Sequence, residues 1–192
     1  MYERLKKDTK WSILKLGNFK TNFIKDEIIV FDKEWDLDIS RQNKYFTHVN
    51  TKVFNIISSN FENWHPGSKI EVVKHNQFKS IKANNQLNII FDILEKYYCG
   101  IIISCEVVKL SKNSNVRVHV DGGALLHYAR RIHVPIVTNK DITFIVMDNE
   151  IHMQESGWYE INNQMRHGAN NPTDQDRIHL IIDIFPDNMI NY

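Results

Sequence analysis

The chain has 192 residues, 42% of them hydrophobic and 24% charged, with a formal net charge of +1 at pH 7, so it is long enough for one sizeable core and short for two. A near-neutral charge without a basic stripe argues against a nucleic-acid-binding protein, and no apolar run approaches the ~20 residues of a transmembrane helix. Because residues 1–8 also lack the apolar core of a signal peptide, we expect one cytoplasmic domain spanning 1–192, without nucleic-acid or membrane partners.

The first half of the chain has weak periodicity and one convincing helix. We predict short strands at 18–24 and 27–31, a loop or helical turn at 35–42, and strands at 51–57 and 69–75 that flank a Pro66-Gly67 turn. Residues 85–98 place apolar side chains at i, i+3, i+4 and i+7, which predicts a helix. Asn84 or Asn85 is its expected N-cap, and Gly100 is its expected stop.

The second half of the chain is rich in short β-type runs separated by Asn, Asp, Ser and Gly. The predicted strands are 101–108, 116–120, 131–137, 142–147, 159–162 and 177–184. Many short strands with turn punctuation indicate a sandwich or jelly roll. We therefore expect 1–99 to supply strands and a supporting helix, and 100–186 to form the core barrel. Cys99 and Cys105 are six residues apart, beyond disulfide reach on one strand, and are expected as buried free thiols.

The stretch Val118-His119-Val120-Asp121-Gly122-Gly123 carries the clearest chemical signal. Residues i and i+2 of a strand share a face, so His119 and Asp121 present an imidazole and a carboxylate side by side. His167 can complete a two-His-one-carboxylate set that leaves other metal positions open, as in non-heme Fe(II) oxygenases. A His-x-Asp pair also arises by chance, so a strand histidine that binds no metal is the alternative.

Arg177 follows His167 by ten residues, across a turn-rich segment, and a hairpin there would place the two side by side. A guanidinium inside a small barrel is costly unless it is paired. A ligand carboxylate can pair it in a bidentate fork. An ion pair with Asp174, Asp176 or Asp183 is the alternative that the spacing leaves open.

Arg131 and His133 form a second polar pair on one face of strand 131–137, whose other face is apolar. This alternation predicts a strand with one face in the core and a polar face toward the barrel interior. Ordinary solvent exposure of the polar face is the alternative. His127, in the loop after the His-x-Asp motif, is a candidate for the mouth of a pocket.

Residues from about 100 to 186 resemble the aspartyl/asparaginyl β-hydroxylase family of Fe(II)- and 2-oxoglutarate-dependent oxygenases, which includes bacterial proline hydroxylases. The matching stretches are Val118-His119-Val120-Asp121, Arg131-Ile132-His133-Val134-Pro135-Ile136, Gly157-Trp158-Tyr159-Glu160-Ile161-Asn162-Asn163, His167 with Asn171, and Arg177-Ile178-His179-Leu180-Ile181-Ile182-Asp183. The resemblance implies a mainly β fold: a double-stranded β-helix of the jelly-roll, cupin-like type with one or more covering helices.

The resemblance also implies roles for individual residues. By analogy His119, Asp121 and His167 bind iron, Arg177 binds the distal carboxylate of 2-oxoglutarate, and Arg131 and His133 line the cosubstrate or substrate end of the site. Two residues depart from the family pattern: Trp158 stands where many relatives carry Glu, and Val108 where some carry a Ser that helps to hold the cosubstrate.

The implied activity uses Fe(II), 2-oxoglutarate and O2 to hydroxylate an unactivated C–H bond of an amino acid, free or within a peptide, of the aspartyl/asparaginyl or prolyl type. It releases succinate and CO2. His127, Arg130 and Trp158 suit an acidic or zwitterionic substrate, and Asn162 or Asn163 is a candidate to hold a ligating histidine. A non-catalytic cupin-like metal- or ligand-binding module and a redox-inert metal hydrolase with the same ligands are the competing functions.

Overall fold

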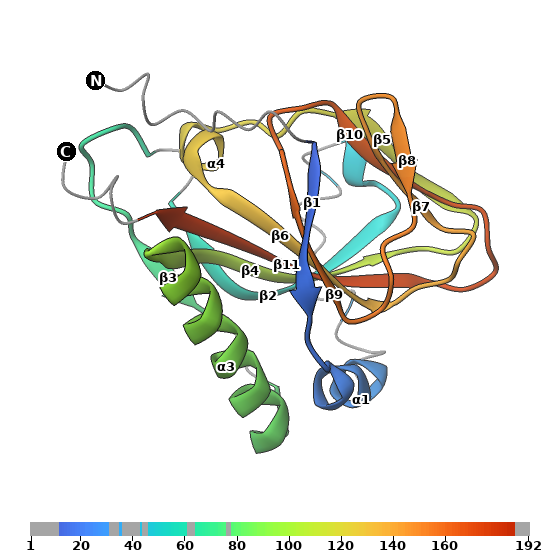
Figure 1. The fold of residues 1–192 in the computed structure, drawn as a ribbon, viewed down its shortest axis with the longest axis horizontal. Helices are drawn as coiled ribbons and strands as arrows, with labels where there is room; N and C mark the ends of the chain where they lie inside the picture. Colours follow the sequence, from blue (N-terminus) through green and yellow to red (C-terminus); the bar gives the residue numbers. More distant parts are fainter. Residues whose placement is uncertain are drawn as a thin grey trace.

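Two antiparallel sheets form the body of the protein in a computed structural model that describes residues 12–30, 35, 43, 46–60, 64–75 and 78–186 (Figure 1). The seven-stranded sheet has the order β1 (Ile13–Asn18), β9 (Gly157–Ile161), β6 (Arg130–Val137), β11 (Arg177–Pro186), β4 (Gly100–Leu110), β2 (Thr51–Ser59) and β3 (Val72–Lys74). The four-stranded sheet has the order β5 (Ser114–His119), β10 (His167–Asn171), β7 (Thr143–Val146) and β8 (Asn149–Ile151). The mainly β jelly roll that the sequence predicts is confirmed.

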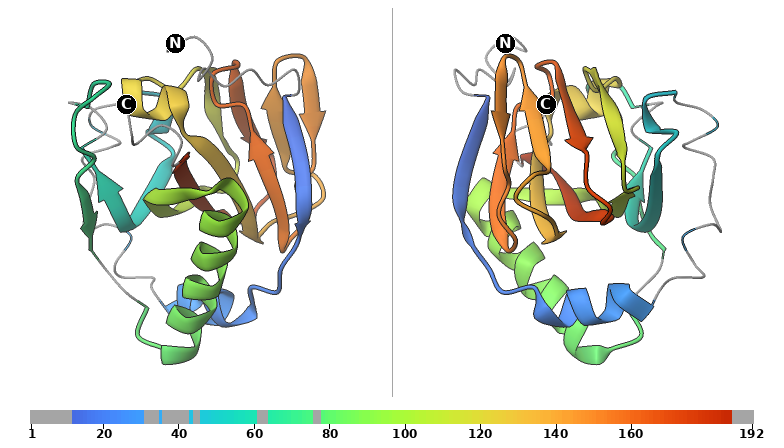
Figure 2. Two further views of the ribbon diagram at one scale, coloured as in Figure 1. Left: turned by 60° about the vertical axis from the view of Figure 1, so that its left-hand side comes forward. Right: turned by 90° about the vertical axis from the view of Figure 1, so that its right-hand side faces the viewer.

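Helices cover the side of the large sheet that faces away from the small sheet. Figure 2 shows α1 (Asn22–Val30) and α3 (Ile81–Tyr98) together on that side. On β6, Ile132 and Val134 are fully buried in a core cluster that includes Ile24 of α1 and Ile90 of α3. The alternate residues of β6 and β11 include a row of polar side chains, Arg131, His133, Arg177, His179 and Asp183, so this sheet buries polar as well as apolar side chains.

The polar row is the feature of the large sheet that positions the site. His133 is 4% exposed and His179 is 2% exposed, and Arg177 and Asp183 are also buried. The alternation predicted for strand 131–137 is therefore confirmed, and ordinary solvent exposure of its polar face is wrong.

Helix α3 begins at Ile81, four residues before the predicted start. Its N-cap is Ser80, whose Oγ accepts a hydrogen bond from the backbone N–H of Ala83. The predicted cap at Asn84 or Asn85 is wrong, because both residues lie inside the helix and the Asn84 side chain bonds to the backbone of Phe78. The apolar periodicity did not predict the first turn, because Ile81 is an exposed apolar residue that lies outside the buried stripe.

The helix ends at Tyr98. Its C-cap is Cys99, which adopts a left-handed conformation with φ 44° and donates its backbone N–H to the carbonyl oxygen of Glu95. Cys99 is exposed, so the expectation that both thiols are buried holds for Cys105 alone. Gly100 opens β4 rather than stopping the helix. A Cβ on Gly100 would lie 2.5 Å from the carbonyl oxygen of Phe185, so the close approach of β11 requires glycine there.

The N-terminal strand predictions at 18–24 and 27–31 are wrong. Residues 22–30 form helix α1, because Ile24 and Ile28 lie one turn apart and bury one apolar stripe beside α3. The strand predicted at 69–75 is present only as the shorter β3. Strand β1 was not predicted from sequence. Residues 36–42 of the predicted loop lie outside the described residues. Strands 51–57, 101–108, 116–120, 131–137, 142–147, 159–162 and 177–184 are confirmed with small shifts of their ends.

Three elements near the site were not predicted: α4 (Ala124–Tyr128), β8 and β10. Strand β10 has the sequence His-Gly-Ala-Asn-Asn, which has no alternation of apolar and polar residues. It pairs with β5 on one side and β7 on the other, so its strand conformation comes from its neighbours.

A β-bulge in β5 directs the first histidine of the motif inward. The register pairs Ala169 with Val116 but His167 with His119, so two residues of β5 lie opposite Gly168 alone. Val116 and His119 therefore both face the cavity between the sheets although they are three residues apart. A Cβ on Gly168 would lie 2.8 Å from the carbonyl oxygen of Val116, so the bulge needs glycine at this position.

A buried carboxylate attaches α3 to the large sheet. The Tyr98 hydroxyl donates to Glu160 Oε2 at 2.7 Å, and Arg130 Nη1 lies 3.4 Å from Glu160 Oε1. Burial, followed by the charge of Glu160, raises the pKa of Tyr98, so this phenol stays protonated and able to donate.

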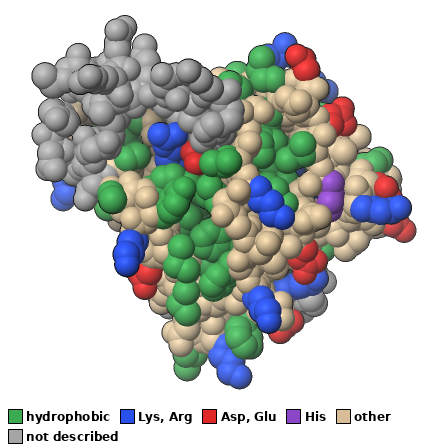
Figure 3. Space-filling view, in the orientation of Figure 1, with side chains coloured by type: hydrophobic (Ala, Val, Ile, Leu, Met, Phe, Trp, Pro, Cys, Tyr) green, Lys and Arg blue, Asp and Glu red, His purple; other side chains and the backbone are tan. Residues whose placement is uncertain are grey.

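The outer surface carries charges of both signs. Lys and Arg side chains are interspersed with Asp and Glu side chains on the face shown in Figure 3. Within the described residues, none of the helices has the length and apolar character that crossing a membrane requires.

Removal of the Tyr98 hydroxyl tests the attachment of α3. We expect Tyr98→Phe to lower the free energy of unfolding by about 1–3 kcal/mol, because a buried hydrogen bond to a carboxylate is lost. Denaturant unfolding measures the change. Tyr97→Phe is the matched control, since Tyr97 is 66% exposed, and it should leave stability unchanged. Equal losses for the two variants would contradict the role of the Tyr98–Glu160 bond.

Substitution of Gly168 tests the bulge. We expect Gly168→Ala to destabilise the protein by about 1–3 kcal/mol, because the added methyl group overlaps backbone that cannot move away freely. Gly17→Ala is the control. Gly17 also lies beside a shift of strand register, but no atom lies within 4 Å of the position that an added methyl group would take. Thermal unfolding of the two variants should differ clearly, and similar melting temperatures would show that β5 tolerates a side chain there.

Candidate active site

Three side chains that are distant in sequence converge where β5 and β10 lie side by side. His119 ends β5, Asp121 follows it, and His167 begins β10. His119 Nε2 lies 3.4 Å from Asp121 Oδ1, and His167 Nε2 lies 3.6 Å from the same oxygen. The ligand atoms of all three residues lie within 4.8 Å of one another. The structure thus brings together the three residues predicted as a metal site.

Backbone carbonyl groups fix the tautomer of both histidines. Nδ1 of His119 lies 2.8 Å from the carbonyl oxygen of Arg117, and Nδ1 of His167 lies 2.9 Å from that of Met165. A carbonyl oxygen only accepts, so each Nδ1 carries the hydrogen and each Nε2 presents a lone pair. The lone pairs therefore point toward the Asp121 carboxylate.

This set of donors fits a divalent first-row metal ion. Two imidazole nitrogens and one carboxylate oxygen from one side are the ligands that such ions take in proteins. Two atoms that each bond one ion at about 2.1 Å lie at most about 4.2 Å apart, and both His–Asp distances satisfy this limit. Lone pairs that face a carboxylate repel one another without a cation, so the arrangement itself favours a bound metal.

Arg131 holds the carboxylate of the set. Its Nη1 bonds to Asp121 Oδ2, and its Nε and Nη2 form a bidentate pair with Asp183 at 2.8 Å each. Burial opposes ionisation of Asp121, but the charge of the Arg131 guanidinium holds the pKa of Asp121 well below its usual range. Arg131 thus lies beside the metal set and keeps its carboxylate ionised and oriented.

A cavity between the sheets contains the three ligands and also Arg177. Its lining includes the following residues: His48, Thr51, Val108, Val116, His119, Asp121, Arg131, His133, Phe144, His167, Gly168, Ala169, Arg177 and Ile181. Apart from the named ionisable groups, these walls are largely apolar. A ligand in this cavity therefore meets the metal set, Arg177 and apolar surface together.

Arg177 is buried, with 5% of its surface exposed, and has no acidic partner among the described residues. The three acids that spacing left open do not pair with it. Asp183 binds Arg131, and Asp176 binds the backbone of Lys112. Burial lowers the pKa of Arg177 to about 10, so the group stays a cation at neutral pH.

Two neutral histidines surround the guanidinium. His179 Nδ1 lies 2.8 Å from Arg177 Nη2, and His133 Nδ1 lies 3.3 Å from His179 Nδ1. Burial, and then the charge of Arg177, lowers the pKa of both histidines well below the usual value. His133 lines the cavity as predicted, whereas His179 was not singled out for a role in the site.

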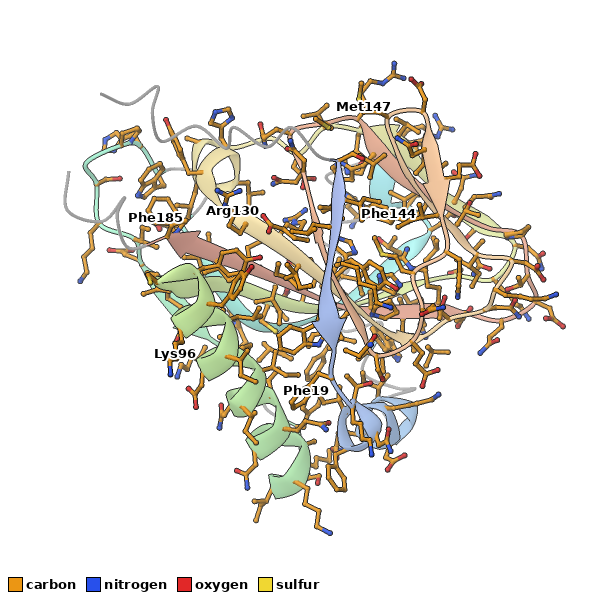
Figure 4. All side chains as sticks on the ribbon, in the orientation of Figure 1. Phe19, Lys96, Arg130, Phe144, Met147 and Phe185 are labelled. Carbon is orange, nitrogen blue, oxygen red and sulfur yellow. The ribbon has the colours of Figure 1, made fainter. Side chains whose placement is uncertain are left out.

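The three predicted substrate residues do not line the cavity. Trp158 packs in the helix-covered core against Phe19, so its position does not fit a substrate contact. Arg130 pairs with Glu160, and Figure 4 shows it well apart from Phe144, a cavity residue. His127 lies in α4, where its Nδ1 contacts Gln164 Oε1 at 2.8 Å.

Asn163, a candidate to hold a ligating histidine, contacts the carboxylate ligand of the set. The Asn163 carbonyl accepts a hydrogen bond from the backbone N–H of Asp121 at 3.2 Å, and its side chain donates to Leu126. Asn163 therefore positions the carboxylate ligand, while backbone carbonyls position the histidines.

Sequence analysis missed two residues that belong to the site. His48, in the 3-10 helix η2 (Phe46–His48), lies edge-on to His119 with ring centroids 5.2 Å apart. Phe144 on β7 stacks on His167 with centroids 6.2 Å apart. His48 lies in a segment whose similarity to the family is weaker, and it was given no role; Phe144 stands in no motif. Val108, where some relatives carry Ser, also lines the cavity.

Comparison with solved structures identifies the fold. A viral collagen prolyl hydroxylase from Paramecium bursaria Chlorella virus-1, in complex with 2-oxoglutarate, has a TM-score of 0.57 at 9% identity and covers 92% of this chain and 97% of its own. A Pseudomonas putida prolyl-4-hydroxylase has a TM-score of 0.57 at 8% identity, with 92% and 94% covered. An oxidoreductase of the 2-oxoglutarate–Fe(II) oxygenase family from Burkholderia pseudomallei has a TM-score of 0.50 at 12% identity, with 70% and 66% covered.

At these identities the likeness establishes the fold alone. No curated protein sequence matches the chain. The family of aspartyl/asparaginyl β-hydroxylases matches residues 69–186, which is more than half of the 192-residue chain. The matched range includes the three residues of the metal set and Arg177. The chain therefore belongs to the aspartyl/asparaginyl β-hydroxylase family.

Proposed function

We propose that this protein uses Fe(II), 2-oxoglutarate and O2 to hydroxylate an unactivated C–H bond of an amino acid, free or within a peptide, with release of succinate and CO2. The observation that carries the proposal is a buried cation without an acidic partner among the described residues, Arg177, on the same cavity as the His119, Asp121 and His167 set. An acidic partner within the protein would neutralise the guanidinium, whereas the positive charge of Arg177 can bind an anionic ligand.

The cavity suits a dicarboxylic 2-oxo acid. Arg177 offers a guanidinium that can bind the distal carboxylate in a bidentate fork. Val108, Phe144 and Ile181 give the same cavity apolar walls. A carboxylate at Arg177 would pair the buried charge, and its apolar linker would fill the space up to the metal set. Fixing the cosubstrate at both ends in this way would pre-organise the reaction.

His119, Asp121 and His167 would hold Fe(II). When bound, the metal supplies the O2 activation that protein side chains do not provide. Arg131 orients the Asp121 carboxylate through Oδ2 and leaves Oδ1 directed at the two histidines. The buried lining residues His133, Phe144, His167 and Arg177 would limit the access of water to the reacting groups and so limit unproductive side reactions.

The three substrate residues predicted from sequence do not line the cavity, so we infer that other residues contact the substrate. His48 lies beside His119 on the cavity wall and comes from η2, outside the two sheets. It is therefore placed to contact a substrate near the metal set. The aspartyl/asparaginyl or prolyl type of amino acid is tested by incubating free amino acids and peptides with the enzyme and measuring a mass gain of one oxygen.

Turnover of 2-oxoglutarate tests the reaction class. With Fe(II) and O2, we expect the wild-type protein to release succinate slowly even without a substrate, and His119→Ala to lose this activity because one metal ligand is missing. Succinate is quantified by mass spectrometry. Equal release by both proteins would refute the metal assignment. A metal-dependent hydrolase would act without 2-oxoglutarate, and a binding module would release no succinate.

Two arginine substitutions separate a ligand-binding charge from a structural one. We expect Arg177→Met to raise the KM for 2-oxoglutarate on the order of a hundredfold, because a buried carboxylate loses its charged partner. Its melting temperature should not fall, because a buried charge without an acidic partner is removed.

Arg130→Met is the matched control, since Arg130 is paired with Glu160 outside the cavity. This variant should lose stability and keep the wild-type KM for 2-oxoglutarate. If Arg177→Met instead lost stability and kept its KM, Arg177 would be a structural residue and the proposed cosubstrate site would be wrong.

A further inference from the structure

His179 is the side chain that fixes the Arg177 guanidinium. The two residues share the inner face of β11, and Nη2 of Arg177 lies 2.8 Å from Nδ1 of His179. Nδ1 of His133, on the adjacent strand β6, lies 3.3 Å from the same nitrogen. The exposed fractions of Arg177, His179 and His133 are 5%, 2% and 4%, so bulk water does not compete for these contacts.

The chemistry of the three groups determines where the hydrogens lie. A guanidinium has only donors, so Nδ1 of His179 accepts and carries a lone pair. The ring hydrogen of His179 is therefore on Nε2. The contact with His133 then requires a hydrogen on His133 Nδ1. Two donors, one from Arg177 and one from His133, are directed at a single neutral acceptor.

A neutral acceptor has a consequence for binding that an acid would not have. An aspartate or glutamate at position 179 would also orient the guanidinium, but it would pair the charge. A ligand carboxylate would then have to displace it. The imidazole orients the group through one N–H and leaves Nη1, Nε and the net charge for a ligand.

We propose that His179 is the positioning residue of the cosubstrate anchor: its uncharged Nδ1 fixes Arg177 and leaves the guanidinium charge for the distal carboxylate of 2-oxoglutarate. This inference rests on the function proposed above. His133 supports the arrangement, because its N–H donates to the same acceptor and keeps the His179 ring in place.

Three variants of His179 separate orientation from charge. His179→Asn keeps a neutral acceptor near the position of Nδ1. His179→Asp has the same shape as Asn but adds a negative charge, and His179→Leu has no acceptor. Calorimetry on the Mn(II)-loaded proteins gives the Kd of 2-oxoglutarate and of 2-oxopentanoate, a 2-oxo acid of equal length without the distal carboxylate.

We expect the wild type to prefer 2-oxoglutarate, and His179→Asn to bind it within about threefold of the wild type. His179→Leu should weaken its binding about tenfold and His179→Asp about a hundredfold. Binding of 2-oxopentanoate should stay within about threefold in every variant, because it makes no contact that needs the charge. His179→Asp should melt no lower than His179→Asn, since its carboxylate pairs Arg177.

The Asn–Asp comparison decides the inference even if the leucine variant fails to fold. Equal affinities of the Asn and Asp variants for 2-oxoglutarate would overturn it, as would affinities that simply follow melting temperature. A wild type without preference for 2-oxoglutarate over 2-oxopentanoate would instead overturn the proposed function, so the two failures are distinguishable.

Discussion

The buried polar row on the inner face of β6 and β11 is the constraint on which the site depends. Charged groups in a protein interior are costly unless each is paired, hydrogen-bonded or bound to a ligand. Asp183 and Asp121 share the guanidinium of Arg131, which satisfies one half of the row. Arg177, in the other half, has neutral histidines for neighbours. No acid among the described residues pairs with its charge, so the charge is available to a ligand.

The metal set also has uncompensated charge in the interior, but here the charge is negative. The hydrogens on both Nδ1 atoms are held by backbone carbonyls, which leaves lone pairs and a carboxylate facing one another. A cation resolves that repulsion, just as an anion resolves the charge of Arg177. One cavity thus contains a set of groups suited to a cation and a buried guanidinium suited to an anion, together with apolar wall residues. This combination is the basis of the proposed binding of a metal-chelating dicarboxylate.

Part of this arrangement was readable from sequence because it depends on local periodicity. Period-two alternation placed Arg131 and His133 on one face of a strand and identified the polar row. The His119-x-Asp121 pair and its order relative to His167 and Arg177 carried the resemblance to the family. Other parts were not readable. Strand β10 has no strand-like pattern, and α1 appeared as strands because its single buried stripe covers only two turns.

The candidate substrate residues show that neighbours in sequence need not be neighbours in the cavity. Arg130 and Trp158 neighbour motif residues in sequence, but successive side chains of a strand point to opposite faces, and both turn away from the cavity. His48 and Phe144 reach the site from segments without a motif. Proximity along the chain therefore did not predict proximity to the metal set.

The sequence by itself determined the family, the strand-rich fold and the chemical type of each proposed ligand, because these follow from residue identity and from patterns repeated over a few residues. Only the tertiary structure decided how the charges are partnered. Asp183 was a candidate partner for Arg177 by spacing, yet it binds Arg131 on the neighbouring strand, and a bulge opposite Gly168 turns His119 inward. Pairing across strands depends on register and on which side chains share a buried face, and neither is encoded within a single local segment.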